Sequence, residues 1–213
     1  VFKGIETGAD IIQFAVQRVD DQGNTIPFLH RMSKQGLQTL NQDILLELSN
    51  RSAWFAWLRV YKRALFQEIR FPVGKNYEDA YTTPLLFFAA KTAYFSPEVL
   101  INYRINPHGI TATKSRKNID DLGGVPLFYL ERIEQHPELV ATMIAISQSH
   151  IMDVLNVDGI SAAQQRWKTL KQKMRQHPLN ETMIRNRGNR LFFQYGVAFL
   201  LFDRTLRRLG LKK

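Results

Sequence analysis

Residues 75–91 read KNYEDAYTTPLLFFAAK and place two neighbouring carboxylates, Glu78 and Asp79, in front of an apolar and aromatic run. Proline is tolerated in the first turn of a helix and kinks anything longer, so Pro84 predicts a helix that begins between residues 77 and 82. Both acids then lie at its positive end, where the helix dipole favours ionised carboxylates. Because adjacent side chains diverge by about 100° on a helix, at most one would reach a given substrate atom. Either both acids are ordinary N-terminal charges, or one is a general base, which must be ionised to accept a proton.

Upstream of this stretch the sequence alternates between strand and helix signals. Residues 11–19 (IIQFAVQRV) and 25–32 (TIPFLHRM) flank the turn-rich DDQGN, which predicts a β-hairpin, and Pro27 pushes its second strand toward a sheet edge. Leucine and isoleucine recur at helical spacing in residues 34–48, which predicts an amphipathic helix. Residues 53–66 predict a strand that runs into a short helical turn.

Downstream, residues 92–105 (TAYFSPEVLINYRI) predict two short strands broken at Ser96 and Pro97, followed by a turn in NPHGIT. Beyond residue 113 the strand signals nearly vanish. Breaks at Pro137, Gly159 and Pro178 separate the helices expected there. These helices lie near residues 117–135, 138–156, 161–176 and 189–208. The sequence therefore predicts an α/β portion, 1–113, with a mixed sheet and helices, followed by a mostly α-helical extension, 114–213.

Charge divides the chain at the same place. Residues 1–113 hold 12 Lys and Arg against 10 Asp and Glu, a net charge of +2, whereas residues 114–213 hold 17 against 9, a net charge of +8. A basic half of this kind either interacts with a polyanionic partner, such as phospholipid headgroups, nucleic acid or a phosphorylated glycan, or simply keeps the protein in solution.

Composition excludes several classes of site. The chain has no cysteine, which excludes disulfides, Cys-ligated zinc and thiol nucleophiles and is typical of a reducing compartment. No apolar stretch approaches the roughly 20 residues that span a bilayer, and the N-terminus has no signal-peptide pattern. We therefore expect a cytoplasmic protein, either soluble or peripheral on the inner face of the cytoplasmic membrane. A start at Val1 rather than methionine suggests a fragment or a processed product.

Four motifs follow one another across about 60 residues, in an order that resembles a known family. They are a Trp-Leu-Arg-Val-Tyr segment at 57–61, a Phe-Pro-Val-Gly loop at 71–74, the Glu78–Asp79 pair, and a Tyr-Arg segment at 103–104 that leads to Gly-Ile-Thr at 109–111. Together they resemble the C-terminal half of the catalytic domain in inverting nucleotide-sugar glycosyltransferases of family two, which have the GT-A fold. The resemblance covers roughly residues 1–113, and nothing specific is recognised beyond residue 114.

The resemblance implies roles for individual residues. Asp79 looks like the base that deprotonates the acceptor hydroxyl, and Glu78 like an acceptor or helix-capping contact. Arg59 stands where the family usually has lysine, so it and Arg104 are candidate contacts of the donor's diphosphate, whose negative charge builds as it leaves. Trp57 would stack on a sugar or nucleoside, although a tryptophan inside WFAW is more often a core residue.

The family also implies a divalent metal, Mg²⁺ or Mn²⁺, and His108 is the candidate metal or diphosphate contact. The alternative for His108 is a plain surface turn, and for Arg104 an ion pair with a strand neighbour. No Asp-x-Asp and no Asp-Asp-Gly-Ser turn occurs in the chain, Leu58 replaces the usual asparagine, and Gly109 replaces the usual serine. The chain thus looks like the acceptor-side half of such an enzyme without its nucleotide-binding half, and we expect it to be inactive alone.

The remaining acid pairs and one aromatic residue have simpler interpretations. Asp20 and Asp21 of VDDQGNT lie between two strand-like runs and predict a solvated hairpin turn, and the same applies to Asp120 and Asp121. Trp54 is expected in the core.

The C-terminal segment 185–213 has arginines at both ends and an aromatic-rich centre, 191–202. It predicts either a core helix or an interfacial helix on an anionic membrane, which would suit an enzyme with a lipid-linked acceptor.

Two functions follow from these patterns. The first is transfer of a sugar from a nucleotide-sugar donor to a glycan or lipid-linked acceptor, with inversion, in bacterial surface polysaccharide assembly. The second is a non-enzymatic basic helical module that binds a membrane surface or a nucleic acid. The chain has no helix-turn-helix, RNA-binding or zinc pattern, so sequence-specific nucleic-acid recognition is not expected.

Overall fold

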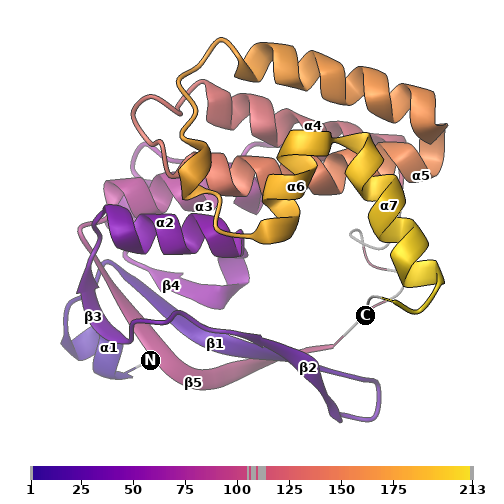
Figure 1. The fold of residues 1–213 in the computed structure, drawn as a ribbon. Helices are drawn as coiled ribbons and strands as arrows, with labels where there is room; N and C mark the ends of the chain where they lie inside the picture. The colour runs from indigo at the N-terminus through magenta and orange to yellow at the C-terminus, as the bar shows by residue number, and fades with distance from the viewer. Residues whose placement is uncertain (1, 105, 107–108, 110–113, 212–213) are drawn as a thin grey trace. The chain divides into compact units, whose positions relative to one another are not determined.

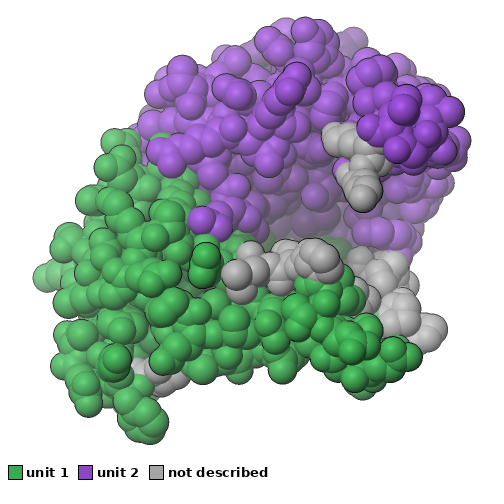
Figure 2. Space-filling model, turned by 60° about the horizontal axis from the view of Figure 1, so that its bottom comes forward, with its two compact units in different colours: residues 1–48, 53–113 green, residues 49–52, 114–213 purple. Residues whose placement is uncertain are grey.

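A computed structural model describes residues 2–104, 106, 109 and 114–211. The chain divides into two compact units, residues 1–48 and 53–113 (unit 1) and residues 49–52 and 114–213 (unit 2) (Figure 2). The division after Thr113 coincides with the change in charge and in secondary-structure pattern. Unit 1 combines a mixed sheet with helices, and the described part of unit 2 from Lys114 onward is helical, so the α/β class is confirmed.

Unit 1 is built around two long parallel strands, β1 (Ile11–Val19) and β5 (Thr92–Arg104). On one edge, β1 pairs antiparallel with β4 (Arg59–Tyr61) at its start and with β2 (Thr25–His30) at its end. On the other edge, the first residues of β5 pair antiparallel with β3 (Gly36–Thr39). The predicted hairpin is therefore confirmed, and β2 ends the strand order β2-β1-β5-β3, as Pro27 suggested.

Two helices of this portion pack on one face of the sheet, α2 (Gln42–Arg51) and α3 (Glu78–Ala89) (Figure 1). Alternation along β1 explains how the core is filled, because Ile11 joins the cluster beneath α2 and α3. Its neighbour Ile12 packs against Gly4 of α1 (Phe2–Glu6). A Cβ atom added to Gly4 would lie 2.9 Å from the Ile12 side chain, so the glycine permits this close contact. The predicted core residue Trp54 is confirmed, since it is 3% exposed and packs edge-on against Phe87.

Three expectations about unit 1 need correction. The helix predicted over 34–48 begins only at Gln42, because Leu37 lies in β3 and pairs with Tyr94. The strand predicted to break at Ser96 and Pro97 is continuous, because a register shift against β1 accommodates these residues.

Helix α3 does begin within the predicted window, but it runs on through Pro84 rather than keeping it in the first turn. The buried Leu86 and Phe87 that follow the proline anchor this continuation in the core.

Unit 2 contains four α-helices in its described part. They are α4 (Arg116–Leu130), α5 (Leu139–Met174), α6 (Arg187–Tyr195) and α7 (Val197–Arg208). A short 3₁₀ turn, η3 (Glu181–Met183), precedes α6. Helix α5 is interrupted at Gly159, whose φ of 86° is non-helical, as the sequence predicted.

The single helix expected over 189–208 is in fact two, because Gly196 adopts a φ of 56° between α6 and α7. A Cβ at this position would lie 2.4 Å from Nε1 of Trp167. The glycine thus permits both the left-handed backbone and the close approach to the indole.

Candidate functional site

The start of α3 is an unusual helix N-terminus. Tyr77 precedes it with φ 60° and ψ 31°, a left-handed conformation that is uncommon for a residue with a bulky side chain, and no side chain caps the helix. Glu78 is exposed and Asp79 is half-buried, so the two acids have different environments. The structure therefore places the predicted acid pair in the first turn, with Asp79 as its inward member.

The carboxylate of Asp79 accepts the backbone N–H of Ala80 at 2.8 Å. The backbone N–H of Ala56, in the short 3₁₀ helix η1 (Ala56–Leu58), also interacts with this carboxylate. Burial raises the pKa of Asp79, and the negative charge of Glu78 raises it further, against the two N–H donors and the positive charge of Arg59. The helix terminus favours the ionised form of this carboxyl, whereas burial opposes it, and the pKa of Asp79 lies above its ordinary value.

Arg59 lies in the interior beside this carboxyl, where it is 6% exposed. Its Nε donates to Oε1 of Gln13 at 2.9 Å, its Nη1 to the carbonyl of Phe55 at 2.7 Å, and its Nη2 to the carbonyl of Ala53 at 2.7 Å. Its guanidinium also lies 5.1 Å from the centre of the Phe87 ring. These contacts direct Arg59 to the segment before η1 rather than outward, so it positions the segment that contacts Asp79.

Tyr61 is a member of this cluster that sequence reasoning did not select. Burial raises its pKa, and it lies close enough to Arg59 and Asp79 for both charges to act on it. Its hydroxyl is 3.5 Å from the carbonyl of Ala56, the residue whose N–H donates to Asp79. Its position at the end of the Trp-Leu-Arg-Val-Tyr segment was the signal that could have identified it.

An exposed aromatic stack adjoins η1. Trp57 is 39% exposed and stacks on Phe55, with ring centres 5.1 Å apart, and on Tyr103 of β5, with ring centres 5.5 Å apart. The interpretation of Trp57 as a core residue is therefore wrong. Because rings cover it on both sides, a ligand would meet its edge or the outer ring of Tyr103, which is 37% exposed.

The other predicted site residues are more scattered. Arg104 is exposed at the end of β5, next to Val19 in the register, and among the described residues it makes no ion pair. His108 lies outside the described residues, so its predicted metal or diphosphate contact has no geometry here.

Of the two further acid pairs, the one in the hairpin has the expected turn role, whereas Asp120 and Asp121 lie in helix α4 rather than in a solvated turn, and Asp121 is buried. Asp20 accepts the backbone N–H groups of Gln22 and Asn24, and the side-chain amide of Asn24 holds its pKa low. In α4, Asp121 pairs with Lys117, and Asp120 lies 3.9 Å from Arg166. These carboxylates are turn and helix contacts rather than parts of the α3 cluster.

The metal that the resemblance implied has no group of ligands among the described residues. Across residues 2–104, 106, 109 and 114–211, no group of three or more His, Cys, Asp or Glu side chains could hold an ion.

No protein-family model matches the chain, and no curated protein matches it. Within the described residues, every helix is too short or too polar to cross a membrane.

Proposed function

We propose that this chain is the acceptor-side part of an inverting glycosyltransferase, with Asp79 as the general base. Asp79 takes the proton of an acceptor hydroxyl, the oxygen attacks the anomeric carbon of a nucleotide-sugar, and the nucleoside diphosphate leaves with the bonding electrons. The acceptor is a glycan or a lipid-linked saccharide, and the reaction belongs to bacterial surface polysaccharide assembly on the cytoplasmic side of the membrane.

The observation that carries this proposal is the environment of Asp79. Burial and the neighbouring Glu78 raise the pKa of Asp79, and a carboxylate with a raised pKa is a stronger base than an exposed one. The N–H groups of Ala80 and Ala56 orient the carboxylate, and Arg59 fixes the segment that carries Ala56. A carboxylate that is positioned in this way and has a raised pKa is, once ionised, a stronger base toward an acceptor hydroxyl.

The aromatic stack supports the binding of a sugar or a nucleoside. Trp57 of the stack lies next to Ala56 in η1, and Ala56 is the residue of η1 that interacts with the carboxylate of Asp79. Tyr103 offers an exposed ring at the outer end of the stack, and sugar faces and bases both pack on such rings. Arg104, the next residue along β5, is exposed and makes no ion pair with the described residues, but the alternation of side chains along a strand places it on the other face from Tyr103.

The test is Asp79→Asn in the complete protein, measured by sugar transfer and by donor binding. We expect transfer to fall by a factor of about 10² to 10⁴, the usual contribution of a general base, while donor binding is retained. Asp43→Asn is the matched control, because Asp43 is an exposed acid in the first turn of α2. Near-normal turnover in Asp79→Asn would remove the base assignment.

A second candidate function is attachment to an anionic membrane surface through residues 185–213. Helix α7 and the residues after it expose three large apolar side chains, Phe202 (62%), Leu209 (66%) and Leu211 (71%), beside basic residues such as Arg207 and Arg208. The opposite face of α7 is buried through Val197 and Leu200, so only part of the segment is available for lipid. Co-sedimentation with anionic but not neutral vesicles, weakened by salt, is expected; equal recovery with both, or none, excludes it.

A further inference from the structure

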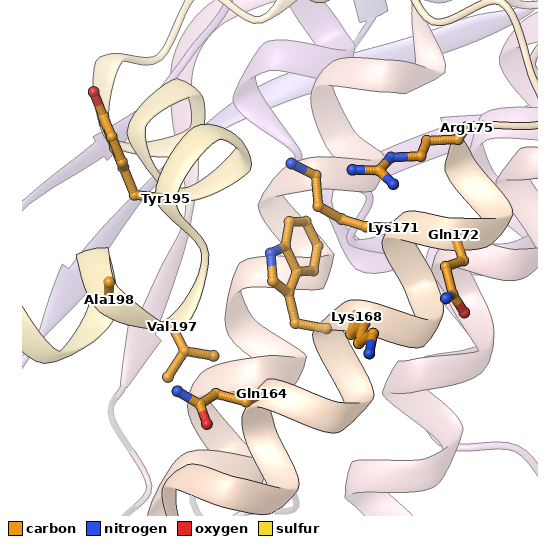
Figure 3. A pocket seen from close by; sticks show the side chains of 9 residues that line it. Gln164, Lys168, Lys171, Gln172, Arg175, Tyr195, Val197 and Ala198 are labelled. Atoms are coloured by element: carbon orange, nitrogen blue, oxygen red, sulfur yellow. The ribbon is translucent and has the colours of Figure 1, made fainter.

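Unit 2 contains a groove of about 410 Å³ that none of the functions above uses. The second half of α5 forms one wall, and the end of α6 and the start of α7 form the other (Figure 3). Lys168, Lys171 and Arg175 line the α5 wall, and no carboxylate lies among the described residues that line the groove. None of these three cations forms a salt bridge within the described part of the chain. The groove is therefore a concentrated positive site without an internal counter-charge.

Helix geometry brings two of these cations together. Lys171 and Arg175 are four residues apart, which places them one above the other on the same face of α5. Figure 3 shows both side chains extending from α5 to the same side, toward the wall formed by α6 and α7. The ammonium of Lys171 is also held by two rings, 5.8 Å from the centre of Trp167 and 4.8 Å from that of Phe193. Its position is thus fixed before any anion arrives.

A neutral donor adds to the two cations. Trp167 is 7% exposed and lines the groove, packed 4.4 Å from Phe192 between ring centres. Its indole N–H has no hydrogen-bond acceptor among the described residues, so it can donate to a ligand. Gly196 allows this edge of the ring to approach the α6–α7 connection, where a Cβ would collide with Nε1.

We propose that this groove binds a phosphate or diphosphate group of a phosphorylated saccharide. Lys171 and Arg175 neutralise the charge, the fork of Arg175 suits two phosphate oxygens, and the indole N–H of Trp167 donates to a third. Gln164 and Gln172 line the same groove and offer amide groups to hydroxyls, and Tyr195, 61% exposed, offers a ring to a sugar face. The site lies within unit 2 and does not depend on Asp79 or on transfer activity.

The experiment uses inorganic pyrophosphate as the probe and the indole N–H signals of the full chain as the readout. The chain has 3 tryptophans, so a ¹⁵N–¹H spectrum resolves them, and Trp167→Phe identifies one. At constant ionic strength set with sodium chloride, pyrophosphate is expected to shift the Trp167 signal in a saturable way and to leave Trp54 and Trp57 unmoved. No shift, or a shift that chloride reproduces, would overturn the proposal.

Variants of matched charge separate a site from general attraction. Lys171→Gln combined with Arg175→Gln is expected to weaken pyrophosphate binding about tenfold or more, since it removes two charge-assisted contacts. The control combines Lys173→Gln with Arg190→Gln, which removes the same charge from α5 and α6 outside this groove. Equal weakening in both double variants would show that only net charge matters, and the groove would lose its assignment. Circular dichroism confirms that both double variants are folded.

A second arm distinguishes a free phosphate group from a lipid headgroup. Vesicles that contain phosphatidic acid are co-sedimented with the wild-type chain in the presence and absence of pyrophosphate. Recovery that pyrophosphate reduces, and that Lys171→Gln with Arg175→Gln abolishes, assigns the phosphate to a lipid-linked ligand. Recovery that both treatments leave unchanged comes from other residues, and the phosphate group is then a free saccharide phosphate if the Trp167 signal responds. Without either response the proposal fails.

Discussion

Replacement of Arg59 by methionine tests whether this arginine organises the α3 cluster from within. The change removes donors to Gln13, Phe55 and Ala53 while it keeps an unbranched side chain against Phe87. Hydrogen bonds from charged groups contribute about 1.5–3 kcal/mol each, and two of the three are fully buried. Burial lowers the pKa of the Arg59 guanidinium, so methionine recovers part of a desolvation cost. We expect a net loss of about 3 kcal/mol in the free energy of unfolding.

Urea unfolding by circular dichroism measures this loss, and hydrogen exchange resolved by peptide locates it. Faster exchange is expected in residues 53–61, which Arg59 holds, and unchanged exchange in α5 of unit 2. Arg63→Met is the matched control, because Arg63 is an exposed arginine in the 3₁₀ helix η2 (Arg63–Phe66). Surface changes of this kind stay within about 0.5 kcal/mol. If Arg59→Met destabilised the chain no more than Arg63→Met does, the structural role of the guanidinium would be refuted.

Three further predictions concern pH and packing. Burial lowers the pKa of His150, so as the pH drops the unfolded chain binds a proton at this histidine before the native chain does. The free energy of unfolding should therefore fall as the pH drops below about 6.5. In thermal unfolding, His150→Gln should flatten this dependence of stability on pH. Burial raises the pKa of Asp79, so as the pH drops the native chain binds a proton at this carboxyl before the unfolded chain does. Asp79→Asn should therefore be at least as stable as wild type at pH 7, and any gain in the free energy of unfolding should vanish below pH 3.8, the ordinary pKa of the group. A loss of stability at pH 7 would contradict this prediction. Gly123→Ala would place a Cβ 2.5 Å from Cε1 of His150, and overpacking of a buried site should cost about 1–3 kcal/mol in urea unfolding.

The sequence predicted those elements whose signals are local. The hairpin of β1 and β2 was predictable because turn-forming residues lie between two apolar runs. The interruption of α5 was predictable because Gly159, which has no Cβ, adopts a φ of 86° without steric strain. Strand β3 could not be found in this way. Leu37 shares the helical spacing of the residues after it, but its pairing partner, Tyr94, lies more than fifty residues further on. The Leu37 side chain is 47% exposed, so it does not share a buried helix face with the apolar residues of α2 that follow it at helical spacing.

The candidate site divides in a similar way between local and distant determinants. Its acid pair could be selected from sequence because a helix start is a local signal. The direction of the pKa shift of Asp79 could not, since it depends on burial against η1, whose Ala56 comes from a distant segment. The exposure of Trp57 could not be predicted either. Phe55 precedes η1 and is a local neighbour, but Tyr103 comes from the distant strand β5, so the full stack exists only once the sheet has formed.

The helix starts of this chain differ in a way that bears on function. Helix α4 begins with Ser115, which accepts the N–H of Asn118, and α6 begins with Asn186, which accepts the N–H of Asn189; both are ordinary stabilising caps. Helix α3 is preceded instead by Tyr77, which is left-handed and whose side chain makes no capping hydrogen bond to the helix.

The cost of this arrangement falls within three consecutive residues. A left-handed conformation costs a residue other than glycine about 1–2 kcal/mol, and burial and Glu78 then raise the pKa of Asp79. Asparagine or glycine at position 77 and an amide at position 79 would both relieve the fold. Local departures that stability alone does not explain concentrate where a protein does chemistry, and the coincidence of these two at one helix start supports Asp79, rather than the better-exposed Glu78, as the reacting group.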